Sequence, residues 1–210
     1  MLAKPTDSTL GTPLAPAGPA AASSAAAAGA ALLDRIDALL PQTQCTRCGY
    51  DGCRPYAAAL AAGAAALNRC PPGGAAGIAA LAALLGREPL PLDPSCGSES
   101  DPGVAWIEPQ ACIGCARCLP VCPTDAILGA RHYLHRVLES SCTGCELCIE
   151  SCPVDCISMQ PRSGGGAAPT AAQNRGRYDE HRSRTERLQR ERAALLAERK
   201  RSAPAAPGPR

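Results

Sequence analysis

Apolar side chains recur at helical spacing in the first half of this chain. Five aliphatic residues lie between residues 25 and 40 and are followed by Pro41, namely Leu32, Leu33, Ile36, Leu39 and Leu40. The pattern predicts a helix that begins in the alanine run near residue 25 and ends before the proline. The stretches 55–67 and 77–85 predict two further helices, because prolines and glycines at 71–74 interrupt the chain between them.

Short apolar runs in the second half are typical of strands. Residues 104–108 and 156–159 predict one strand each, and 126–128 and 135–139 are expected to pair as a hairpin. Two segments repeat each other at an offset of thirty residues, as CPTDAI and CPVDCI show. The repeat predicts a pseudo-two-fold unit in which each half consists of a strand, a loop, a short helix and a strand.

The two ends of the chain are poor in bulky apolar side chains. Residues 1–24 are rich in alanine, proline, serine and glycine, which predicts a disordered arm. Residues 175–201 are rich in helix formers, but their apolar stripe consists of three leucines, which predicts a solvated helix or a disordered tail. The uncharged segment 8–33 holds three prolines and is mostly alanine, so we expect no membrane span there.

Twelve of the fourteen cysteines fall into three groups of four. Two groups share the spacing C-x2-C-x2-C-x3-C followed by proline, at Cys112, Cys115, Cys118 and Cys122 and at Cys142, Cys145, Cys148 and Cys152. Bacterial ferredoxins hold two [4Fe–4S] clusters with this run. The short gaps let one tight loop direct three thiolates at one iron–sulfur cube, whereas structural zinc sites pair two short knuckles across a longer gap.

In the two-cluster arrangement, the fourth cysteine of each run ligates the other cluster. We therefore assign Cys112, Cys115, Cys118 and Cys152 to one cluster, called the second site below. The other cluster, the third site, is assigned Cys142, Cys145, Cys148 and Cys122. This exchange is expected to tie the two halves of the repeat together.

The first group reads C-x2-C-x4-C-x16-C and consists of Cys45, Cys48, Cys53 and Cys70. This spacing alone leaves two alternatives open, a third [4Fe–4S] cluster and a zinc site. Gly49 and Gly52 lie between these cysteines, and glycine allows backbone amides to approach sulfur closely. We call this group the first site.

The start of the chain has no apolar core of a signal peptide, and fourteen cysteines without one indicate a reducing compartment and metal binding. The net charge of +2 is unevenly distributed: residues 99–161 carry a net charge of −5, whereas 162–210 carry +7. The acidic block is expected to steer docking to a basic redox partner. The basic block lacks stacking aromatics except Tyr178, which argues against nucleic-acid binding.

We expect structural roles for the remaining candidate residues. Cys96 is expected to be a free thiol in a linker and Cys156 a small core residue beside a cluster. We expect surface or loop roles for the three histidines, His132, His135 and His181. Trp106 and Tyr133 are expected to pack the core or shield a cluster. Asp125 and Asp155 are expected to have turn roles. The sequence has no Walker loop, no G-x-G-x-x-G and no paired nucleophile and base, so we expect no catalytic site of its own.

The stretches LLPQTQCTRCGYDGCRPYA, NRCPPGG, LLGREPLPLD and CPVDCISM closely resemble the B subunits of the Rnf (Rsx) electron transport complex over about residues 36–160. The resemblance implies a third [4Fe–4S] cluster at the first site. It also implies a relay on the cytoplasmic face of the inner membrane, between ferredoxin or flavoprotein donors and other Rnf-type subunits that carry flavin. Members of that family usually begin with a membrane-anchoring helix, which the alanine- and proline-rich arm replaces here, so we expect peripheral membrane contact at most.

Together these observations predict an α+β fold that binds three [4Fe–4S] clusters. The expected parts are a disordered arm, a mostly helical single-cluster domain, a linker, a two-cluster ferredoxin-like domain and a basic tail, at 1–24, 25–90, 91–102, 103–162 and 163–210. The predicted function is single-electron transfer to or from an Rnf-type complex. Two alternatives are a soluble polyferredoxin that serves another oxidoreductase and an adaptor that binds nucleic acid or protein and uses its clusters structurally.

Overall fold

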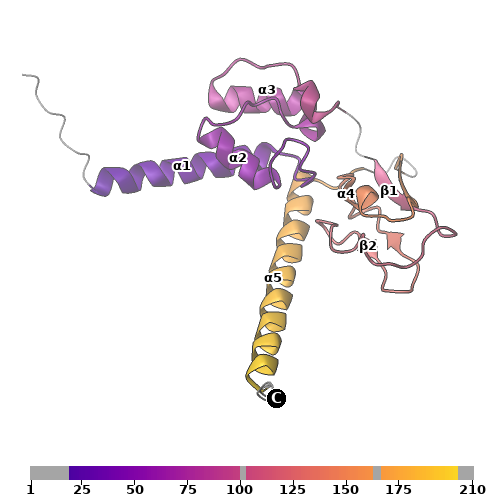
Figure 1. The fold of residues 1–210 in the computed structure, drawn as a ribbon. Helices are drawn as coiled ribbons and strands as arrows, with labels where there is room; N and C mark the ends of the chain where they lie inside the picture. Colours follow the sequence, from indigo (N-terminus) through magenta and orange to yellow (C-terminus); the bar gives the residue numbers. More distant parts are fainter. Residues whose placement is uncertain (1–18, 100–102, 163–166, 203–210) are drawn as a thin grey trace, which may run out of the picture.

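The structure, a computed structural model, describes residues 19–99, 103–162 and 167–202. Parts of the predicted arm, linker and tail lie outside the described residues, namely 1–18, 100–102, 163–166 and 203–210. The described chain contains helices and short strands, as an α+β fold requires. Figure 1 shows the helices of the first half of the chain at one end, the strands at the other and the long C-terminal helix, which leaves from between them.

The helical part contains α1 (Pro19–Leu39), α2 (Cys53–Ala61) and α3 (Gly74–Leu85), and the short 3-10 helix η1 (Pro71–Gly73) precedes α3. All three predicted helices are present, but α1 begins before residue 25. Helix α2 ends earlier than predicted because Gly63 has a left-handed φ of +70° and its N–H donates to the Leu60 carbonyl at 3.0 Å. A second 3-10 helix, η2 (Pro94–Cys96), lies in the predicted linker.

The core of the helical part combines aliphatic side chains with cysteines. Ile36, in the last turn of α1, and Leu40, directly after α1, belong to this core, and residues of α2 and α3 pack against them. The largest buried apolar side chains are Ile36, Leu40, Tyr56, Leu60 and Leu81. Helices α1 and α2 pack together along their apolar stripes, as the periodicity predicts. The carbonyl end of α1 therefore lies beside the cysteine-bearing start of α2.

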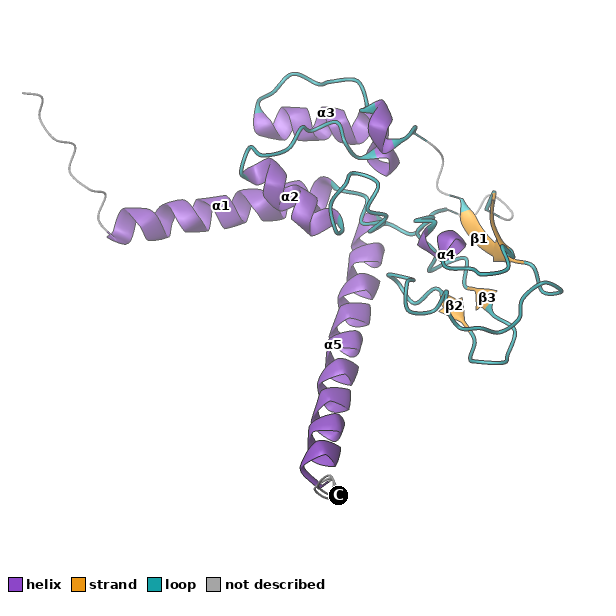
Figure 2. Ribbon diagram, in the orientation of Figure 1, coloured by secondary structure: helices purple, strands orange, loops and turns teal. Residues whose placement is uncertain are grey.

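The strand part is built from two short antiparallel pairs. Strand β1 (Val104–Ile107) pairs with β4 (Ile157–Gln160), and β2 (Ile127–Leu128) pairs with β3 (Arg136–Val137). Figure 2 shows β1, β2 and β3 in one region around α4 (Leu147–Glu150). The predicted strands and hairpin are present. The first half of the repeat, however, has only turns at 117–120, where the second half forms α4.

Cysteines form a large part of the core of the strand part. Its buried members include four cysteine side chains from the two runs, namely Cys118, Cys122, Cys142 and Cys148. Trp106 and Tyr133 do not pack this core, because they are 52% and 71% exposed; the alternative that they shield a cluster stays a prediction. A domain this poor in bulky apolar side chains depends on other cross-links, and bound metal is the natural one here.

The basic tail forms one helix, α5 (Ala171–Ser202). Thr170 precedes it, and its hydroxyl accepts a hydrogen bond from the Gln173 N–H at 3.3 Å, as in an N-cap. The last turn carries Arg199, Lys200 and Arg201, whose charges suit the negative end of a helix dipole. Among the described residues, no helix combines the length and the apolarity needed to cross a membrane.

Candidate metal sites

The four cysteines of the first site line one small cavity. Cys45, Cys48 and Cys53 come from the loop between α1 and α2 and from the first residue of α2, and Cys70 precedes η1. All four side chains are buried. The chain therefore directs four sulfur ligands at one enclosed space, which suits a thiolate-ligated metal group.

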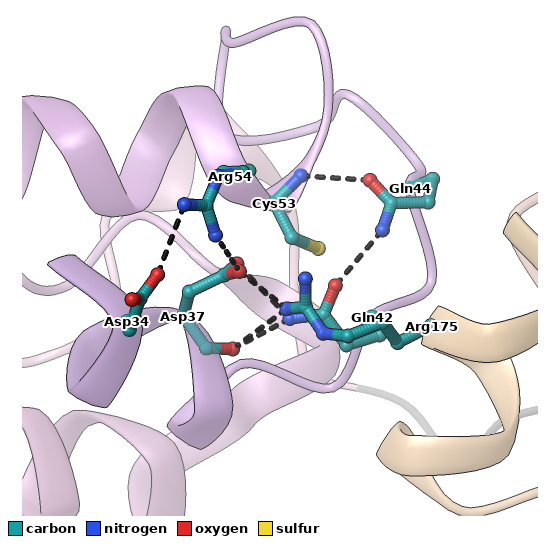
Figure 3. Close-up of polar contacts among 7 residues, drawn as sticks. All are labelled: Asp34, Asp37, Gln42, Gln44, Cys53, Arg54 and Arg175. Carbon is teal, nitrogen blue, oxygen red and sulfur yellow. Dashed lines mark hydrogen bonds and ion pairs between the residues drawn. The ribbon is translucent and has the colours of Figure 1, made fainter. Parts of the chain in front are cut away.

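A ladder of amide side chains holds the loop of the first site (Figure 3). Gln42 Nε2 donates to the Asp37 carbonyl at 2.6 Å, and Gln44 Nε2 donates to Gln42 Oε1 at 2.9 Å. Gln44 Oε1 in turn accepts the backbone N–H of Cys53 at 2.9 Å. Both glutamines have left-handed φ values, +58° and +55°, a strained conformation that these buried hydrogen bonds offset.

Gly52 is required where the loop enters α2. Its φ is +110°, and a Cβ there would lie 2.6 Å from Gln44 Oε1, the atom that holds Cys53. A larger residue would therefore strain the backbone and break the ladder at the same position. Burial raises the pKa of the Cys48 thiol, and a hydrogen bond from the Tyr50 N–H to its sulfur lowers that pKa by a smaller amount. This contact supports the sequence-based expectation that glycines let the backbone approach the sulfurs.

The two cysteine runs exchange their fourth members in space. The thiol of Cys118 lies near those of Cys115, Cys112 and Cys152, so the last residue of the second run joins the first three of the first run. The thiol of Cys148 lies near those of Cys145, Cys142 and Cys122. The fold thus brings together the two sets of four that the spacing assigned to the second and third sites.

Burial raises the pKa of several of the thiols in the three sites. It raises the pKa of Cys118 and Cys145 to about 11 and the pKa of Cys148 to about 12, and neighbouring cysteines add to the rise. In the first site, burial raises the pKa of Cys53 and Cys70 to about 12. Metal ligation requires thiolates, so assembly of each site must release protons.

The turn after the first run places a backbone donor on a sulfur. Asp125 has a left-handed φ of +50°, and the next N–H, that of Ala126, donates to Cys122 Sγ at 3.2 Å. Asp155 has the same conformation in the second half, with a φ of +49°. The turn roles predicted for both aspartates agree with these φ values.

Two cysteines outside the assigned sets also lie near the sites. Cys156 is buried, and its Sγ lies 3.4 Å from Cys152 Sγ, as expected of a small core residue beside a cluster. Cys96 is free, but it is buried in η2 near Cys48 and does not face solvent from the linker. Among the described residues, no three His, Cys, Asp or Glu side chains are arranged to hold a single metal ion.

The predicted surface or loop roles left out the contacts of two histidines, although His135 does lie in the loop before β3. His135 is 2% exposed, and its Nδ1 lies 3.6 Å from Cys118 Sγ and 3.7 Å from Cys112 Sγ. His181 lies on α5, and its Nδ1 is 2.9 Å from Asp125 Oδ1. Their sequence neighbours contain no ligand motif, so no sequence signal indicated these contacts. His132 is exposed in a turn, as predicted.

Contacts between two loops join the first and third sites. Thr143 Oγ1 donates to the Thr43 carbonyl at 3.2 Å, although the two residues are 100 positions apart. Arg47, inside the first group, forms an ion pair with Glu146, inside the second cysteine run. The hydrogen bond to Glu146 raises the pKa of Arg47, and the thiols of Cys45 and Cys145 both lie close enough to add to the rise.

Helix α5 contacts both parts of the molecule. At its start, Arg175 forms an ion pair with the buried Asp37 at 2.5 Å, and Asn174 Nδ2 donates to the Pro41 carbonyl at 3.1 Å. Further along the helix, Arg184 bonds Asp125 at 2.6 Å. Burial alone would raise the pKa of Asp125, but hydrogen bonds to Arg184 and His181 lower it overall. Helix α5 therefore connects the helical part to the strand part, and we call it the clasp. Its thin apolar stripe did not indicate these contacts.

Comparison with known proteins identifies both cysteine regions. Residues 105–159 match the 4Fe–4S dicluster domain, and residues 40–72 match a family described as a putative Fe–S cluster. The chain is 61% identical to the B subunit of the ion-translocating oxidoreductase complex of Alkalilimnicola ehrlichii, over 62% of this chain and 70% of the relative. The chain belongs to the family of B subunits of ion-translocating oxidoreductase complexes.

Other B subunits of this family are similarly close. The identity is 59% to the protein of Azoarcus sp., over 62% of this chain and 71% of the relative, and 58% to that of Hahella chejuensis, over 64% and 68%. No solved structure matches the chain. The family is the one that the sequence resemblance over about residues 36–160 implied.

Proposed function

We propose that this chain is an electron-transfer subunit that holds three [4Fe–4S] clusters. The ligands would be Cys45, Cys48, Cys53 and Cys70 at the first site, Cys112, Cys115, Cys118 and Cys152 at the second, and Cys142, Cys145, Cys148 and Cys122 at the third. The observation that carries the proposal is that twelve cysteines gather as three sets of four, two of them within a matched 4Fe–4S dicluster domain. Such clusters accept and release single electrons when bound.

The donor chemistry fits these groups. Each set offers four sulfur atoms, and backbone N–H groups point at several of them, such as those of Tyr50 to Cys48 and Ala126 to Cys122. Hydrogen bonds of this kind tune cluster potentials. We accordingly assign 25–90 to a single-cluster domain and 103–162 to a two-cluster ferredoxin-like domain.

The contacts between loops supply an order for the three sites. The Thr43–Thr143 hydrogen bond and the Arg47–Glu146 ion pair hold the first site against the third, and the exchange of Cys122 and Cys152 ties the third to the second. The third site is therefore the middle of the series, between the first and the second.

The order is testable by magnetic coupling between reduced clusters. In fully reduced protein, the electron paramagnetic resonance signal of the first site is expected to be broadened by its neighbour. Cys145→Ser, which disrupts the third site, should narrow that signal, because dipolar coupling falls steeply with distance. Cys115→Ser, the matched change in the second site, should leave it broad; narrowing by Cys115→Ser alone would reverse the order.

The partners follow from family membership. The relatives are named as subunits of an ion-translocating oxidoreductase complex, so we propose that this chain joins other subunits of a complex of that kind. Ferredoxin or a flavoprotein would be its exchange partner, and its contact with the cytoplasmic face of the inner membrane would be peripheral.

A reductive titration tests the proposed function. Anaerobically purified protein should show the broad visible absorbance of iron–sulfur cubes, and dithionite should bleach it with the uptake of about three electrons per chain, one for each cluster. A colourless protein that carries zinc and takes up no electrons would refute the proposal.

A further inference from the structure

His135 lies against two sulfur atoms of the second site. Its ring is 2% exposed, and Nδ1 is 3.6 Å from Cys118 Sγ and 3.7 Å from Cys112 Sγ. The other ring nitrogen, Nε2, is buried and has no hydrogen-bond partner among the described residues. The polar contacts of this imidazole are therefore both with proposed cluster ligands.

The packing fixes the ring in this place. His135 comes directly before β3, and Gly129 directly follows β2, the partner strand of the hairpin. A Cβ at Gly129 would overlap the His135 ring, so the glycine leaves the space that the imidazole occupies. The hairpin thus presents the ring to Cys112 and Cys118 as a built feature.

The contact belongs to one half of the repeat only. At the offset of thirty residues, the counterpart of His135 is Ala105, which has no side-chain donor. The second site therefore has an imidazole at a position where its pseudo-symmetric mate, the third site, has a methyl group. The two sites of the dicluster domain differ in this respect.

We propose that His135 is a positioning residue that donates its Nδ1–H to Cys112 and Cys118 and so raises the reduction potential of the cluster at the second site. A ligated thiolate only accepts hydrogen bonds, so Nδ1 must carry the proton. Reduction adds negative charge that is partly borne by the sulfurs, and a fixed donor stabilises the reduced form more than the oxidised form. The inference rests on the ligand assignment in the proposed function.

The test is a potentiometric titration of the separate clusters in the full chain, followed by electron paramagnetic resonance. His135→Leu should make reduction of the second-site cluster about tenfold less favourable, which is about 59 mV for one electron. His135→Asn should restore most of the difference, because the Asn amide nitrogen occupies nearly the position of Nδ1 and also donates. His132→Asn, in the exposed turn of the same loop, should change nothing.

A second readout follows the nitrogen itself. With 15N-labelled histidine, the reduced wild-type cluster should show a weak hyperfine coupling that persists in His132→Asn and is lost in His135→Leu. If His135→Leu fails to assemble the cluster, Gly129→Ala serves as the test variant instead. The alanine methyl group must displace the imidazole ring, so this variant should also lower the reduction potential of the second-site cluster.

The outcomes separate this inference from the proposed function. Unchanged potentials in His135→Leu, with a full complement of iron, would overturn the role of His135 and leave the clusters in place. The absence of iron–sulfur clusters from the wild-type chain would overturn the proposed function instead.

Discussion

Cys152→Ser is expected to remove the same cluster as Cys115→Ser, although the two cysteines belong to different runs. Each single variant should lose about four iron atoms and about four sulfides per chain, one cube. The reason is the exchange of fourth cysteines: the thiol of Cys118 lies near Cys152 as well as near the first two members of its own run. Serine is a close steric match for cysteine but supplies no thiolate.

Double variants make this test specific. Cys152→Ser with Cys115→Ser should lose no more iron than either change alone, because both act on the second site. Cys152→Ser with Cys145→Ser should lose about eight iron atoms, because the changes act on two cubes. If the double change with Cys115 lost two cubes and the double change with Cys145 lost one, each run would ligate its own cluster and the exchange would be wrong.

Asp37→Asn is expected to lower the free energy of unfolding by about 2–3 kcal/mol, because the neutral amide loses the charge-assisted hydrogen bonds that this buried carboxylate accepts. The Asp37 side chain is 2% exposed and forms ion pairs with both Arg54 and Arg175. Its Oδ1 also accepts a hydrogen bond from Gln42 Nε2 at 3.2 Å. This one carboxylate therefore joins α1, the loop of the first site and α5 (Figure 3).

Asp34 supplies the matched control. It also forms an ion pair with Arg54, at 2.9 Å, but its side chain is 63% exposed. Asp34→Asn should therefore cost less than about 1 kcal/mol, as exposed pairs do. The measurement is urea unfolding followed by cluster absorbance. The free energy of unfolding falls by roughly 1–3 kcal/mol per M urea, so the unfolding midpoint of Asp37→Asn should be about 1 M lower. Equal midpoints for the two variants would contradict the proposed clasp.

Local sequence patterns were enough to predict most of the secondary structure. The aliphatic spacing before Pro41 predicted α1, and the short apolar runs around the cysteines predicted all four strands. These elements are set by periodicity and by turn residues, both of which are local. The predicted end of α2 was too late because the helix-ending role of Gly63, a left-handed glycine, was overlooked.

The cysteine spacing predicted sets of ligands that the fold then gathers, but it could not predict their surroundings. Arg175 meets Asp37 across 138 residues, and His181 meets Asp125 across 56. Such contacts are polar and join distant parts of the chain, so they leave no periodic signal. The interpretation of residues 175–201 as a solvated helix or a disordered tail missed its docked first turns for this reason. His135 was missed because the histidine stands alone in sequence and meets Cys112 and Cys118 only through the hairpin.

The three-cluster relay is tested most simply by the iron and acid-labile sulfide content of anaerobically purified full-length protein. Three cubes predict about twelve of each per chain. A value near eight would mean that one of the three sites holds no cluster. A value near zero, with zinc in its place, would contradict the assignment of these cysteines to an electron relay.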